Sequence, residues 1–183
     1  MKNFIVILLL SIFFNSCETD NASHIKFDVK SIKFLTVSSK DELCPKLEID
    51  LSSKSNIADI AKKERSVSSY IFCPLSSNDF SPKNISREKY KLYGAFPQEI
   101  EGNYNIQDSL YNYSLSISFV DEDYNILNQE TVTSIISEKD CIDCKLVFGF
   151  FPKRIKQNTF SDAFCIPVDI IKNEIKESTG ILR

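Results

Sequence analysis

The feature that most constrains the fold is a strict alternation of apolar and polar residues between Tyr113 and Val120. One side of this stretch carries tyrosine, leucine, isoleucine and phenylalanine, and the other carries Ser114, Ser116 and Ser118. A period of two residues is typical of a β-strand with one buried and one exposed face. Because an apolar face must be covered, the sequence predicts that further strands pack beside this one.

Two earlier segments, 25–34 and 46–51, show the same alternation. In the first segment the apolar positions shift by one residue, from Val29 to Ile32. Such a shift would turn every following side chain to the wrong face unless an extra residue absorbs it. We therefore expect a β-bulge at Lys30–Ser31. Further strand patterns cover 67–73, 90–95, 126–136, 146–150 and 164–170.

Helical patterns are few and short. The range 55–65 predicts one short helix with Ser55 or Asn56 as its cap. The range 169–178 is compatible with either a helix or a strand. With seven or eight expected strands and one or two short helices, the pattern favours an all-β antiparallel sandwich. The run from 113 to 133, two strands around an acidic tip, resembles the central hairpin of bacterial Ig-like domains, which implies an Ig-like sandwich.

The N-terminus predicts export. Lys2 precedes an apolar run from Phe4 to Phe14 that is broken by Ser11. About 20 apolar residues are needed to cross a membrane as a helix, so this run has the length of a signal-peptide core instead. Residues 1–16 are therefore expected to be a signal peptide, and 25–183 a single folded domain.

The end of that run resembles the lipobox of bacterial lipoproteins. Ser16 fits the small residue and Cys17 fits the acylated cysteine, whereas Phe14 and Asn15 depart from the usual pattern. The resemblance implies lipidation of Cys17 and a tether over 17–24, whose acidic start is similar to surface-export signals of Bacteroidota lipoproteins. The expected location is the cell envelope, with the chain anchored to the outer membrane on its periplasmic or surface face. An ordinary secretory signal is the alternative.

Five further cysteines remain after Cys17, and an exported protein is expected to pair them as disulfides. The sequence leaves every pairing among them open: Cys44, Cys73, Cys141, Cys144 and Cys165. The alternative is a redox site, because Cys141 and Cys144 form a C-x-x-C motif of the kind that thiol–disulfide oxidoreductases use.

The other chemical motifs are weak. A net charge of −3 gives no reason to expect nucleic acid as a partner. The sole histidine, His24, lies in the expected tether, so a serine or cysteine nucleophile has no histidine base in the domain. The run from Asp121 to Asn125 opens like a calcium loop, but Ile126 stands where that loop needs glycine. We expect no enzyme activity, no cofactor and no metal.

Tyrosines gather in the middle third of the chain, and exposed tyrosines favour binding. A possible binding face for an envelope protein or a glycan consists of Tyr90, Tyr93, Tyr104, Tyr111 and Tyr124. The absence of tryptophan weakens the glycan version. The sequence thus predicts a non-enzymatic binding or scaffolding lipoprotein of the cell envelope. An oxidoreductase and an inhibitor or immunity-type lipoprotein are the alternatives.

Overall fold

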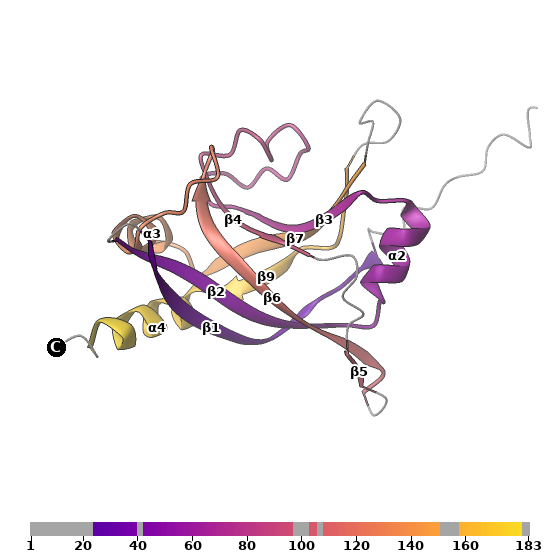
Figure 1. Cartoon of the computed structure of the whole chain (residues 1–183), viewed down its shortest axis with the longest axis horizontal. Coiled ribbons are helices and arrows are strands. Elements are labelled where there is room, and N and C mark those ends of the chain that lie inside the picture. Colours follow the sequence, from indigo (N-terminus) through magenta and orange to yellow (C-terminus); the bar gives the residue numbers. More distant parts are fainter. Residues whose placement is uncertain (1–23, 40–41, 97–102, 106–107, 151–157, 181–183) are drawn as a thin grey trace, which may run out of the picture.

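The computed structural model describes residues 24–39, 42–96, 103–105, 108–150 and 158–180 (Figure 1). The expected signal peptide, Cys17 and most of the tether lie outside the described residues. Within them the chain forms strands β1 (Asp28–Ser39), β2 (Glu42–Ser53), β3 (Ser68–Pro74), β4 (Tyr90–Ala95), β5 (Asn103–Asn105), β6 (Leu110–Asp121), β7 (Cys141–Gly149), β8 (Thr159–Phe160) and β9 (Phe164–Pro167), and helices α2 (Ile57–Glu64), α3 (Gln129–Ile136) and α4 (Val168–Gly180).

All strand pairs are antiparallel, in the order β1-β2-β6-β4-β3-β7-β8. Strand β5 pairs with the start of β6, and β9 pairs with the start of β7. The prediction of an all-β antiparallel fold is confirmed, with nine strands and three helices in the described part rather than seven or eight strands and one or two helices. The range 169–178, which was compatible with either a helix or a strand, lies within helix α4.

The sheet bends so that its two halves enclose one main core, which makes the fold sandwich-like. Just before β1, the ring of Phe27 lies 5.4 Å from the ring of Phe164 of β9 and 6.5 Å from the ring of Tyr113 of β6. These contacts bring opposite parts of the strand order together across the core. Helix α2 covers one end of the molecule, whereas α3 and α4 lie at the other end (Figure 1).

The predicted bulge is present in β1. Val29 pairs with Leu51 and Ser31 pairs with Asp50, so Lys30 is the extra residue. The bulge keeps Ile32 in the core, 8% exposed, on the same side of the sheet as Phe27. It also turns Ser31 to the outer face, which matters for the site described below.

The expectation of a strand over 126–136 is wrong. After a single bridge between Val120 and Ile126, the chain enters helix α3. The side chain of Asn128 caps this helix by accepting a hydrogen bond from the Thr131 amide at 2.9 Å. Val132 and Ile136, four residues apart, are both fully buried. Capping and the helical spacing of these two anchors outweigh the strand preference of β-branched residues.

Two disulfides confirm the prediction of disulfide bonds. Cys73 of β3 bonds to Cys144 of β7, and Cys141 of β7 bonds to Cys165 of β9. The C-x-x-C motif forms the first four residues of strand β7. Residues three apart on a strand point to opposite faces, so its two thiols bond to different partners. Cys44 belongs to β2, but its side chain lies outside the described residues.

Candidate functional site

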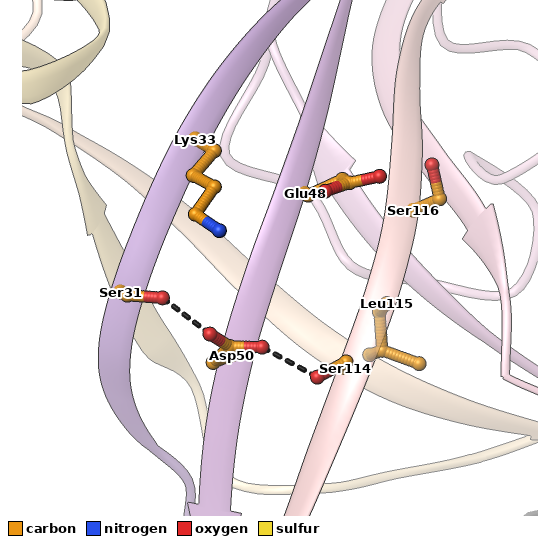
Figure 2. Close-up of a pocket in the computed structure, with 7 residues that line it drawn as sticks. All are labelled: Ser31, Lys33, Glu48, Asp50, Ser114, Leu115 and Ser116. Atoms are coloured by element: carbon orange, nitrogen blue, oxygen red, sulfur yellow. Dashed lines mark hydrogen bonds between the residues drawn. The ribbon is translucent and has the colours of Figure 1, made fainter.

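A polar groove lies on the outer face of β1, β2 and β6. Its volume is about 390 Å³, and Figure 2 shows its lining side chains, which come from three adjacent strands. The sheet register sets them in two rows. Ser31, Asp50 and Ser114 form one row, and Lys33, Glu48 and Ser116 form the next; we call these six residues the polar groove.

Asp50 is the fixed point of the groove. Its carboxylate accepts hydrogen bonds from the hydroxyls of Ser31 and Ser114, one on each neighbouring strand (Figure 2). These two bonds, with a smaller contribution from the Lys33 ammonium, hold the pKa of Asp50 below its ordinary value. Each carboxylate oxygen retains a second lone pair, so Asp50 can accept a further hydrogen bond from a ligand.

The bulge in β1 positions one half of this arrangement. If Lys30 were paired as in a regular strand, Ser31 would point into the core and could not reach Asp50. Bulges are frequent next to functional sites because they redirect a side chain. The groove therefore depends on a local irregularity in an otherwise regular strand.

The second row of the groove presents unoccupied polar groups. Glu48 and Ser116 are exposed and lie opposite each other on the adjacent strands β2 and β6 (Figure 2). Among the described residues, neither side chain makes a hydrogen bond or an ion pair with another. The groove thus combines a fixed acceptor in Asp50 with free acceptors and donors beside it.

A tyrosine cluster adjoins the groove on the same face of the sheet. It consists of Tyr70, Tyr93 and Tyr124, whose successive ring centroids lie 5.1 Å and 5.3 Å apart. Tyr93 pairs directly with Ser118, which follows Ser116 on the same side of β6. Because of this register, the groove and the tyrosine cluster form one continuous surface.

Tyr124 is held in an unusual backbone conformation. Its φ is 64°, in the left-handed region that is costly for a bulky side chain, yet its side chain remains 49% exposed. Its ring lies 3.9 Å from the ammonium of Lys91, which is fully buried. Because backbone strain is frequent at binding sites, the accessible Tyr124 is a candidate functional residue.

Lys91 connects the tyrosine cluster to two loops. Its ammonium donates to the carbonyls of Glu122 at 3.3 Å and Ile85 at 3.5 Å. Burial lowers the pKa of Lys91, and the nearby carboxylates of Asp121 and Glu88 oppose that shift. Lys91 therefore fixes the turn that carries Tyr124 against the loop that precedes β4.

That preceding loop is organised by Glu88, which is 2% exposed. Its carboxylate accepts from the amides of Ser76 at 2.6 Å and Ser77 at 3.0 Å, and from the Asn84 side chain at 2.8 Å. Burial alone would raise the pKa of Glu88, but these hydrogen bonds together hold it below the ordinary value. The loop covers a second small core around Phe72.

The structure divides the tyrosines that the sequence grouped. Tyr93 and Tyr124 meet in the cluster, whereas Tyr90 and Tyr111 pack against the main core. The side chain of Tyr104 lies outside the described residues. Tyr70 was not singled out by the sequence, and neither were Glu48 and Asp50. The alternation in 46–51 separated Glu48 and Asp50 from the apolar face, but their partners lie on β6, far away in the chain: Asp50 and Ser114 are 64 residues apart.

The calcium-like run from Asp121 to Asn125 is used to close a turn. The Asp121 carboxylate accepts from the amides of Asp123 at 2.9 Å and Asn125 at 2.8 Å, and from the Asn125 side chain. These bonds lower the pKa of Asp121. No group of three or more potential metal ligands occurs among the described residues.

No protein-family model matches the chain, and no curated protein or solved structure matches it either. Within the described ranges, none of the helices has both the length and the apolar character to cross a membrane.

Proposed function

We propose that this chain is a lipid-anchored protein of the cell envelope that works by binding, through the polar groove and the adjoining tyrosine cluster. The observation that carries the proposal is the preorganised Asp50, fixed from both neighbouring strands beside groups that have no partner in the described structure. Fixed polar groups lower the ordering cost of binding. The lipobox-like sequence ending in Cys17 supports the anchor.

The arrangement of the strands suits an anchored binding protein. The described chain begins at His24, seven residues after Cys17, beside the start of β1 and of β6. Strand β6 then runs 12 residues, about 40 Å, to the turn that carries Tyr124. A tether at Cys17 would therefore leave the tyrosine cluster at the far end of the sheet from the membrane.

Site-specific cross-linking in cells tests the binding function. A photoreactive amino acid at Ser116 should give adducts with an envelope component, whereas the same residue at Asp59 on α2 should not. Equal yields at both positions, or none at either, would contradict the proposal. If the captured component is a hydrolase or a toxin and binding to this protein lowers its activity, the binding function is that of an inhibitor.

Mass spectrometry of the mature N-terminus tests the anchor separately. The expected product begins at an acylated Cys17, and Cys17→Ser should release the protein from the membrane fraction. An unmodified chain that begins beyond Cys17 would remove the anchor from the proposal.

A further inference from the structure

We propose that the ligand of this surface is a glycan chain, with its sugar hydroxyls in the polar groove and one sugar ring on the tyrosine cluster. This inference rests on the proposed binding function and specifies its ligand. Two observations support it. The polar groove and the tyrosine cluster are continuous because Ser118 pairs with Tyr93, and the groove presents hydrogen-bonding groups while the cluster presents aromatic rings.

The groove has the groups that sugar hydroxyls need. A hydroxyl both donates and accepts, so a polyhydroxylated ligand requires acceptors and donors at short intervals. Glu48 and Asp50 supply acceptors, and Lys33 and Ser116 supply donors, from three strands about 5 Å apart. With two carboxylates and one ammonium, the groove is matched to an uncharged polar ligand rather than to a polyanion.

The tyrosine cluster supplies an apolar platform next to those groups. The face of an aromatic ring carries negative charge, which attracts the polarised C–H bonds on the flat side of a sugar ring. Tyr124 is half-exposed, and its ring is fixed by Lys91 beneath it and Tyr93 beside it. A fixed, accessible ring beside hydrogen-bonding groups is a suitable contact for a carbohydrate.

The common modes of peptide recognition fit this surface poorly. Adding a peptide strand uses the backbone of a free sheet edge, whereas the two carboxylates of the groove lie on β2, which is paired on both of its edges, with β1 and β6. A helical peptide requires an apolar groove, and the residues here are mainly charged or hydroxylated. The groove instead offers side chains on the face of the sheet.

The test uses the lipidated full-length protein in detergent micelles and a set of neutral hexose and N-acetylhexosamine oligosaccharides of increasing length. The chain has seven tyrosines and no tryptophan, so its intrinsic fluorescence comes from tyrosine, and the part of a ligand-induced change that Tyr124→Ala removes is assigned to the cluster. Affinity should increase with oligosaccharide length until the groove and the cluster are both filled. Tyr124→Ala and Glu48→Gln should each weaken binding about tenfold.

Asp59→Asn, on the exposed surface of α2, is the matched control and should bind like the wild type. If no oligosaccharide binds while cross-linking at Ser116 still captures an envelope protein, the glycan proposal is overturned and the binding function remains. If Ser116 captures nothing either, both fail. Oligosaccharide binding that survives Tyr124→Ala and Glu48→Gln together would also overturn the proposed site.

Discussion

At the scale of single residues, the site is built from a few side chains whose positions are strongly determined. Asp50 is fixed by two serines, Glu88 by amides of its own loop, and Tyr124 by Lys91 and Tyr93. Two of these three residues gain hydrogen bonds in the folded state. Tyr124 differs, because its backbone conformation is unfavourable for any residue except glycine.

Replacing Tyr124 separates backbone strain from function. Tyr124→Gly relieves the positive φ while losing the contact with Lys91, so we expect the free energy of unfolding to change by less than about 1 kcal/mol. Tyr124→Ala retains the strain and should be about 1 kcal/mol less stable than Tyr124→Gly. Chemical denaturation of the three proteins measures both differences. If alanine proves more stable than glycine, Tyr124 is not strained.

Glu88 gives the protein an acid-sensitive loop. Because the folded pKa lies below the ordinary 4.5, the stabilisation is fully present above pH 4.5 and is lost as the pH falls through the folded pKa. At neutral pH, Glu88→Gln should lower the free energy of unfolding by about 2 kcal/mol, because amide donors lose a charged acceptor. Denaturation curves over a pH series should show the two proteins converging in acid. A difference that persists in acid would contradict this account.

At the scale of elements, the bulge in β1 links the core to the groove. The sequence predicted it from a shift in the apolar positions, because a buried face leaves no other register. The same reasoning failed for 126–136, where β-branched residues form helix α3. There the decisive contacts, the burial of Val132 and Ile136, come from distant parts of the chain that the sequence does not place.

Deleting Lys30 tests the role of the bulge. The deletion removes the unpaired residue but leaves Ser31 opposite Asp50 and Ile32 opposite Ile49, so every side chain of β1 keeps its face. We therefore expect the cooperative thermal transition to stay within a few degrees of that of the wild type. Lys30→Ala keeps the chain length and should unfold within a few degrees of the wild type. Circular dichroism during heating compares the two variants. Loss of the cooperative transition in the deletion variant, but not in Lys30→Ala, would contradict this account.

At the scale of the whole molecule, two disulfides hold β7 to strands on either side of it. The Cys73–Cys144 bond closes a separation of 71 residues and is fully buried, whereas Cys141–Cys165 closes 24 residues and Cys165 is exposed. The sequence predicted cysteine pairing from the compartment but could not choose partners. That choice depends on which strands neighbour β7, and the neighbours of a strand are a property of the complete sheet.

Removing each disulfide should have an unequal effect. Loop-closure entropy predicts a loss of about 4 kcal/mol for the Cys73→Ala, Cys144→Ala pair and about 3 kcal/mol for the Cys141→Ala, Cys165→Ala pair. The buried pair also leaves a small cavity, which increases the difference. Urea denaturation measures both variants. A larger loss for the exposed pair would contradict the expected order.

The site was less accessible to sequence reasoning than the fold. Alternation placed Glu48, Asp50 and the serines of β6 on outward faces, and that much is confirmed. These residues meet in one groove because β2 pairs with β6, although helix α2 and strands β3 to β5 lie between the two strands in the sequence. Tyrosine spacing alone likewise could not separate Tyr93, on the outer face, from Tyr90, which packs toward the core.

Carboxyl footprinting of intact envelopes tests the central claim most directly. A water-soluble carbodiimide and an amine label accessible carboxylates, and mass spectrometry quantifies each site in native envelopes and in the purified protein. We predict that Glu48 is protected in the envelope relative to the purified protein, while Asp59 on α2 and Glu130 on α3 are labelled equally in both. Equal labelling of Glu48 in the two preparations would contradict the assignment of this surface as the binding site.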